Sequence, residues 1–130
     1  MKKAVISLLL LVVMINSYGI TREDAEKNPI LKGKLLAKRC AWCHDVNRTL
    51  IAPPFKVILK KYSNVSEETL KKRFFNVIKN GSKGKWTEWI KKNVKVKMGE
   101  VDQMYMPPQK PYYNDEEINL IVNWLLSLKK

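Results

Sequence analysis

The sequence predicts an all-α domain of about four to five helices. Apolar side chains recur at helical spacing in four separate segments, and several of these segments begin or end on residues typical of helix caps. No internal repeat or low-complexity tract appears among the 130 residues. The one strand-like stretch is short, so helices are expected to build the core.

Residues 1–19 are predicted to be a secretory signal peptide. They open with two lysines, continue as an apolar run over residues 4–15 and reach small residues at Ser17 and Gly19. The run is shorter than the roughly 20 residues that span a bilayer. Cleavage after Gly19 would leave residues 20–130 as one exported domain; an uncleaved N-terminal anchor is the alternative.

The first helix of the domain is expected to begin at Pro29 and to run directly into Cys40. Asn28 is a typical N-cap, and proline suits the first helical position. Residues 20–28 are polar and are expected to be loose. Gly33 is either a weak helix residue or a point of close contact with another helix. The apolar side of this helix would consist of Ile30, Leu31, Leu35 and Leu36.

Two helices are predicted in the middle of the chain. A short one starts at the segment 51–55 and carries Phe55, Ile58, Leu59 and Tyr62 on one side. A second begins near Asn64 or Ser66, since Asn64 and Glu67 have capping-box spacing, and it ends at Gly81. Its buried stripe would be Leu70, Phe74, Val77 and Ile78.

Residues 81–111 are expected to be irregular, and one more helix follows them. Apolar and lysine residues alternate over residues 94–98, which suggests a strand that Gly99 could turn back toward Val101. Asn114 and Glu117 have capping-box spacing at the start of the last helix. Its apolar face would be Ile118, Ile121, Trp124, Leu125 and Leu128.

The most informative motif is Cys-Ala-Trp-Cys-His at residues 40–44, which has the spacing of a c-type haem attachment site. Cys40 and Cys43 could form thioethers with the two vinyl groups on one porphyrin edge, and His44 could then ligate the iron. Structural zinc usually needs four Cys and His ligands, and this chain has two Cys and one His. A redox-active pair would require a βαβ pattern, which the helical flanks do not provide. A chance occurrence of the motif is the remaining alternative.

The second axial ligand is expected to be a methionine, because His44 is the only histidine. Met98, Met104 and Met106 are the candidates outside the signal segment. We favour Met106, since the two prolines that follow it would stiffen a ligand loop. Methionine more often fills a core, so position has to decide.

The charge indicates an anionic partner. The chain has 25 Lys and Arg against 12 Asp and Glu, and loss of Lys2 and Lys3 would lower its formal net charge from +13 to +11. The chain is predicted to be exported and has no recognisable nucleic-acid-binding motif, so it is not expected to bind nucleic acid. Redox proteins with acidic docking surfaces are the expected partners, together with transient contact with the membrane surface or a membrane-bound oxidase or reductase.

These residues together resemble the small bacterial class I cytochromes c over nearly all of residues 28–130. The resemblance is carried by CAWCH at 40–44, APPF at 52–55, IKNGSKGKW at 78–86, YMPPQ at 105–109 and NWLLSLKK at 123–130. It implies one haem c held by Cys40 and Cys43, with His44 and Met106 as iron ligands. It further implies that the Pro53 carbonyl orients the imidazole, that Trp86 bonds a propionate, and that Trp124 packs the last helix near Gly33.

Two departures from the family pattern are visible. Val77 stands where the family commonly has an arginine for a propionate, so another side chain, such as a lysine, must neutralise it. An insert of roughly Thr87 to Gln103, basic and bearing Trp89, separates Trp86 from Met106. The insert would shield the haem edge or dock a partner; a solvated surface loop is the alternative.

The sequence thus predicts a periplasmic one-electron carrier, not an enzyme, because protein ligands would fill both axial positions. Two alternatives stay open. The chain could be the permanent haem subunit of a larger periplasmic oxidoreductase. It could also be a small-ligand-binding haem protein, if Met106 does not ligate the iron.

Overall fold

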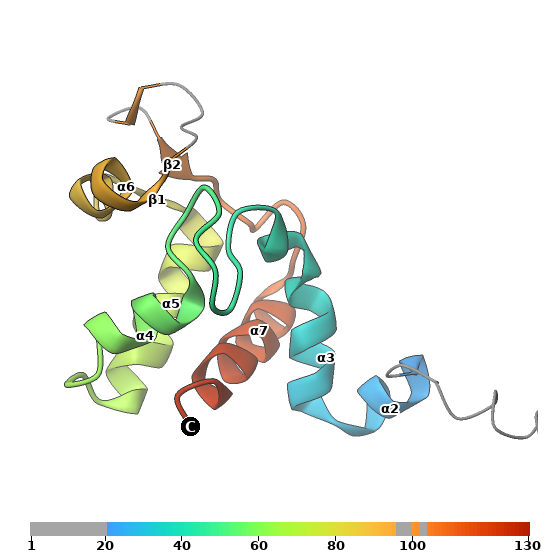
Figure 1. The fold of residues 1–130 in the computed structure, drawn as a ribbon. Helices are drawn as coiled ribbons and strands as arrows, with labels where there is room; N and C mark the ends of the chain where they lie inside the picture. Colours follow the sequence, from blue (N-terminus) through green and yellow to red (C-terminus); the bar gives the residue numbers. More distant parts are fainter. Residues whose placement is uncertain (1–20, 96–99, 102–103) are drawn as a thin grey trace, which may run out of the picture.

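The computed structural model covers residues 1–130 and describes residues 21–95, 100–101 and 104–130. These residues form six α-helices, one 3-10 helix and a two-stranded sheet (Figure 1). In chain order the elements are α2 (Arg22–Lys27), α3 (Pro29–Leu36), η2 (Ala37–Trp42), α4 (Phe55–Lys61), α5 (Glu67–Asn80), β1 (Ser82–Lys83), α6 (Thr87–Asn93), β2 (Tyr105–Met106) and α7 (Asp115–Ser127). The predicted all-α class is confirmed, and two helices, α2 and α6, lie in segments that were not expected to be helical. The predicted signal segment lies outside the described residues.

The first of these two helices, α2, lies in a segment that was expected to be loose. Thr21 and Asp24 form a capping box, in which Asp24 N–H donates to Thr21 Oγ1 at 3.2 Å and Thr21 N–H donates to Asp24 Oδ2 at 3.0 Å. Ala25 is buried. The prediction for residues 20–28 was therefore wrong, because the reciprocal cap and one buried side chain order the turn.

Helix α7 lies between α3 and α5, and its crossing with α3 depends on a glycine (Figure 1). A Cβ on Gly33 would clash with the carbonyl oxygen of Leu120 and lie 3.0 Å from Trp124 Cβ. Gly33 is buried whereas Ile30 is 37% exposed, so the predicted apolar side of α3 was wrong in part. Close backbone approach, not a large apolar stripe, is what packs α3 on α7.

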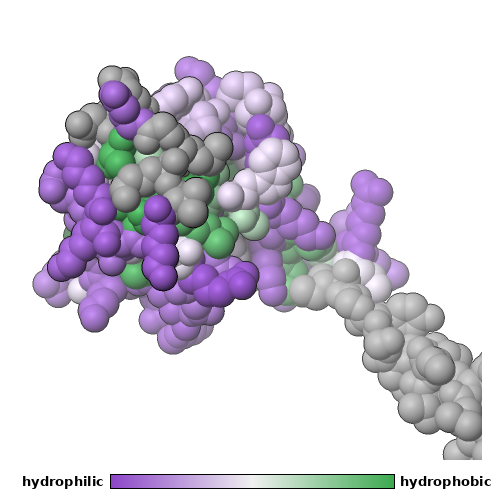
Figure 2. Space-filling view, turned by 45° about the horizontal axis from the view of Figure 1, so that its top comes forward, coloured by the Kyte–Doolittle hydropathy of each residue, from purple (hydrophilic) through white to green (hydrophobic). Residues whose placement is uncertain are grey.

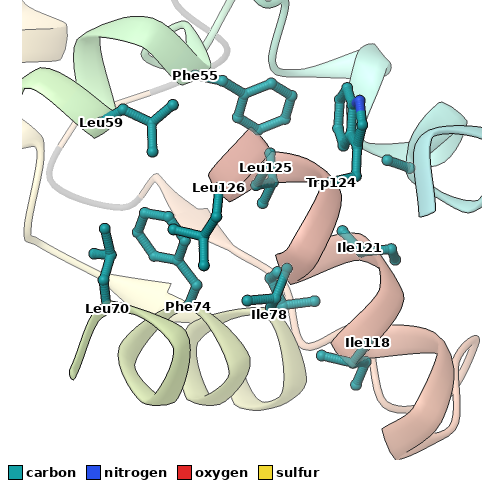
Figure 3. Close-up of a cluster of buried hydrophobic side chains, with 12 residues drawn as sticks. Phe55, Leu59, Leu70, Phe74, Ile78, Ile118, Ile121, Trp124, Leu125 and Leu126 are labelled. Carbon is teal, nitrogen blue, oxygen red and sulfur yellow. The ribbon is translucent and has the colours of Figure 1, made fainter. Parts of the chain in front are cut away.

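The core is formed by side chains of α4, α5 and α7 that point toward one another (Figure 3). Phe55 and Leu59 come from α4; Leu70, Phe74 and Ile78 from α5; and Ile118, Ile121, Trp124, Leu125 and Leu126 from α7. Leu70, Ile118 and Ile121 are fully buried. The predicted stripes on α5 and α7 are confirmed, except that Val77 and Leu128 are only half-buried.

The predicted helix ends are largely confirmed. Asn28 accepts from Ile30 N–H at 3.0 Å, and Asn114 forms the expected capping box with Glu117. Of the two candidate starts for α5, Ser66 is the N-cap, and Gly81 ends the helix at a φ of 78°. Helix α3 stops at Leu36, and the chain enters Cys40 as the 3-10 helix η2.

Residues 81–111 are more regular than predicted. Helix α6 opens the insert, and β1 pairs antiparallel with β2 through Ser82–Met106 and Lys83–Tyr105. The expected hairpin around residues 94–101 falls largely on residues 96–99, outside the described part of the chain. Among the residues that the structure describes, no helix has the length and apolarity that crossing a membrane requires.

Candidate functional site

The first part of the site is a single tight turn that carries the two cysteines and the histidine. Within and after η2, Cys43 N–H and His44 N–H both donate to Cys40 O, at 3.1 and 2.8 Å. Both cysteines are free. Burial raises the pKa of the Cys40 thiol to about 11 and also raises that of Cys43. Both sulfur atoms are therefore protonated at neutral pH, and neither is a ready thiolate.

The His44 imidazole is fixed by a hydrogen bond and by a ring contact. Its Nδ1 lies 2.7 Å from Pro53 O, and since a carbonyl can only accept, Nδ1 carries the proton. Phe55 stacks on the imidazole at 5.2 Å between centroids, and Trp124 meets Phe55 edge-on at 5.6 Å. Burial lowers the His44 pKa, against an opposing effect of the Pro53 hydrogen bond. The result is a neutral imidazole with a free Nε2 lone pair, the form that ligates metals.

The loop between η2 and α4 holds the Pro53 carbonyl in place. Ala52 N–H donates to Cys43 O at 3.2 Å, and Phe55 N–H donates to Asp45 O at 2.9 Å. Pro53 and Pro54 are buried, and proline fixes φ in this segment. The imidazole thus meets a rigid acceptor that the sequence places nine residues away.

The cysteine turn borders an internal cavity of about 300 Å³. Its walls come from α4, α5, α6 and α7, from residues 51–53 and from the β1–β2 region. Cys40, Cys43 and His44 lie at one part of the wall, and Met104 and Met106 lie at another. On the face seen in Figure 2, hydrophobic residues show through within a surround of hydrophilic ones. Such a mostly apolar cavity with a few convergent polar groups is typical of a cofactor site.

The segment that carries Met106 is anchored to the end of α5. Met106 pairs with Ser82 in the small sheet. The two backbones come closest at Gly81, where a Cβ atom would lie only 2.5 Å from Met106 O. Gln109 N–H donates to Ile78 O at 2.9 Å, and its side-chain Nε2 donates to Pro107 O at 2.9 Å. Gln109 was not among the predicted site residues. In the sequence, only its position after the two prolines could have pointed to it. Its burial, with 8% of the residue exposed, and its hydrogen bonds arise from tertiary packing.

Trp86 lines the same cavity, and cationic side chains surround it. Lys61 Nζ lies 4.2 Å from the centroid of the Trp86 ring. Val77, which stands in place of the arginine of the family pattern, lines the cavity, and so do Arg39, Arg73 and Lys85. Arg39 and Arg73 are thus available at the cavity wall for an acidic group of a ligand.

The residues present fit a covalently held haem better than a protein-ligated metal ion. Two protonated thiols, a neutral imidazole and a thioether border one apolar cavity. In the described part of the chain, no group of three or more His, Cys, Asp or Glu could hold a metal ion. The structure brings the predicted residues Cys40, Cys43, His44, Pro53, Trp86 and Met106 to this cavity, and it also brings Met104. Met98 lies outside the described residues.

Sequence comparison finds that the chain is similar to cytochromes c. The cytochrome c family model matches residues 30–129. Cytochrome c-551 of Pseudomonas denitrificans is 30% identical over 93 residues, 72% of this chain and 90% of the relative. Cytochrome c-551 of Stutzerimonas stutzeri is 30% identical over 95 residues, 72% of this chain and 71% of the relative.

Solved structures agree with this fold. Wild-type cytochrome c552 of Nitrosomonas europaea is 27% identical and superposes with a TM-score of 0.54, covering 73% of this chain and 98% of that one. The class 1 cytochrome MtoD of Sideroxydans lithotrophicus ES-1 is 19% identical with a TM-score of 0.52, covering 75% of this chain and 94% of that one. The second similarity concerns the fold alone.

Proposed function

The chain belongs to the cytochrome c family, and on that premise we propose that it is a periplasmic one-electron carrier with His44 and Met106 as its axial ligands. The cofactor of this family is haem c, and the chain carries it as an electron-carrying haem protein. The haem supplies an iron that accepts and returns one electron. The observation that carries the proposal is that one cavity gathers Cys40, Cys43, His44 and Met106 from distant parts of the chain.

The residues of this chain bind, orient and bury the cofactor. Cys40 and Cys43 would hold the haem through thioether links, because each thiol can add across a vinyl group without a leaving group. His44 Nε2 would ligate the iron as a neutral donor, because Nδ1 donates to Pro53 O. A hydrogen bond from Nδ1 to a carbonyl also raises the basicity of Nε2, which strengthens the proximal bond.

Met106 is proposed as the distal ligand in preference to Met104. Both side chains border the cavity. Met106 belongs to β2, is held against Ser82 and Gly81, and precedes two prolines, whereas Met104 precedes the strand. Less reorganisation is needed to keep a thioether in place when its backbone is already fixed. A methionine ligand raises the reduction potential of a haem.

Three observations outside the cavity also support the proposed carrier role: the similarity to two cytochromes c-551, the apolar N-terminal run and the net charge. The two curated relatives are named cytochrome c-551, and the apolar run in residues 4–15 is proposed to direct export. The formal net charge of +13 favours partners with acidic docking surfaces. With protein ligands at both axial positions, no substrate would reach the iron, so we propose no enzymatic reaction.

An optical experiment on the holoprotein tests this assignment. The oxidised protein should show the weak near-infrared band that arises from sulfur-to-iron charge transfer. Met106→Ala should abolish the band and should let carbon monoxide bind the reduced iron. Met104→Ala is the matched control and should leave both properties unchanged. If instead Met104→Ala abolishes the band, the ligand is misassigned; if the wild-type protein binds carbon monoxide, a small-ligand-binding protein is the better interpretation.

A further inference from the structure

A second hollow, of about 580 Å³, lies on the outside of the domain between α4 and the start of α6. Lys60 and Lys61 of α4 form one side of it, and Lys85, Trp86 and Trp89 form the other. Neither thioether cysteine borders this hollow, so it is a different surface from the mouth of the cysteine turn. The hollow and the internal cavity nevertheless share one wall, formed by Gly84, Lys85, Trp86 and Thr87.

The charge of this hollow is positive and largely unbalanced. None of the three lysines is in an ion pair with any described residue. Glu88 also lines the hollow, but its carboxylate lies 3.2 Å from Lys91 Nζ and is already paired. Lys61 stands over the Trp86 ring at 4.2 Å, which leaves its remaining N–H groups for an outside acceptor.

The aromatic side of the hollow, formed by Trp86 and Trp89, is held in place by packing and hydrogen bonds. Trp86 and Trp89 meet edge-to-face at 6.2 Å. Ile90 is buried and lines the internal cavity, so it seats α6 on the domain. Gly84, at a φ of 78°, and the Thr87 Oγ1 hydrogen bond to Gly84 O at 3.3 Å shape the turn before α6. Tryptophan is enriched where partner proteins bind, and the lysines beside these two indoles add a positive potential that steers an acidic partner.

We propose that this hollow, formed by Lys60, Lys61, Lys85, Trp86 and Trp89, is the docking site for an acidic segment of a redox partner protein. The proposal rests on the electron-carrier function above. Charge complementarity selects the partner: carboxylates of the segment would pair with the three lysines, and its apolar side chains would cover the two indoles. A partner bound there would contact Trp86, which also borders the cofactor cavity. Docking would therefore bring the partner close to the haem with which it exchanges an electron.

The proposal is tested on the isotope-labelled holoprotein with a blocked deca-glutamate peptide as the probe. The chain has four tryptophans, whose indole N–H signals serve as separate reporters. The signals of Trp86 and Trp89 should shift on titration, while those of Trp42 and Trp124 should stay in place. Lys60→Gln with Lys61→Gln should weaken binding on the order of fivefold at an ionic strength of about 0.01 M, where the Debye length is about 30 Å.

A matched variant separates this site from general charge. Lys32→Gln with Lys34→Gln removes the same two charges from α3, which lies across the molecule from α6 (Figure 1), and neither lysine is in an ion pair among the described residues. This variant should bind the peptide nearly as the wild type does. Trp89→Leu should weaken binding without any change of charge.

Two results would overturn the proposal. Equal weakening by the two lysine pairs would mean that net charge alone attracts the peptide. Binding of phosphatidylglycerol vesicles, but not of the peptide, that depends on Lys60 and Lys61 would make the hollow a membrane contact. The optical spectrum of every variant separates a failure of this proposal from a failure of the proposed function, because docking variants should keep the sulfur-to-iron band.

Discussion

Removal of both thioether cysteines should unfold the domain, and the size of the cavity explains why. In Cys40→Ala with Cys43→Ala the haem loses its covalent links, and the internal cavity of about 300 Å³ would have to stay open or collapse. At about 24 cal/mol per Å³, a fully enclosed and dry cavity of this size would cost ~7 kcal/mol, which is the upper limit here because the cavity is partly open to solvent. The whole stability of a domain is about 5–15 kcal/mol, and a small domain lies toward the lower end.

A loss approaching that limit would remove most of the native free energy of unfolding. The assay is circular dichroism of the purified variant, with a thermal melt to detect cooperative unfolding. Cys40→Ser with Cys43→Ser is the matched control for side-chain size, and we expect the same loss of helix from it. A stable variant that lacks haem, keeps native helix content and melts cooperatively would refute the reasoning, since it would show that α4, α5 and α7 close the core without the cofactor.

Two further predictions concern the contacts that assemble the helices. Gly33→Ala should destabilise the holoprotein by about 2 kcal/mol, because an overpacked contact costs up to ~3 kcal/mol and alanine returns ~1 kcal/mol in helix propensity. The melting temperature should fall by roughly 10 °C, whereas Lys34→Ala on the same helix should leave it nearly unchanged; equal melting of both variants would contradict close packing of α3 on α7. Tyr113→Phe removes the hydrogen bond from its hydroxyl to Leu36 O, 2.6 Å long, and should cost about 1 kcal/mol in denaturant unfolding while the optical spectrum stays unchanged. A shifted spectrum would instead mean that Tyr113 acts on the haem site.

Several features of the fold were predictable because they depend on residues close together in the chain. Asn28 caps the helix that starts beside it, and Asn114 with Glu117 closes a capping box three residues long. Gly81 ends α5 at a positive φ, as a glycine there predicts. The cysteine–histidine turn is equally local, since its backbone hydrogen bonds return to Cys40.

The errors arose where tertiary contacts outweigh local pattern. The apolar stripe of α3 suggested that Ile30 would be buried, but the backbone of α7 approaches at Gly33 and Ile30 stays partly exposed. Helix α6 lies in a segment read as irregular; it is seated by Ile90, whose burial requires the cavity wall. Helix α2 is a different case, because its Thr21–Asp24 capping box spans only four residues and could have been predicted from the sequence.

The sequence by itself determined the chemistry of the candidate site, that is, which thiols, which imidazole and which thioethers are available, and it determined the helices that build the core. Only the tertiary structure decided where those groups meet. Pro53 O reaches His44, Gly81 lets the backbone of Met106 come close, and Trp86 ends as a wall shared by the cavity and the outer hollow. The physical reason is that helix caps and tight turns are stabilised by groups within about four residues of one another. A cavity and a docking surface exist only after distant segments have packed, and their energies depend on shapes that no local pattern contains.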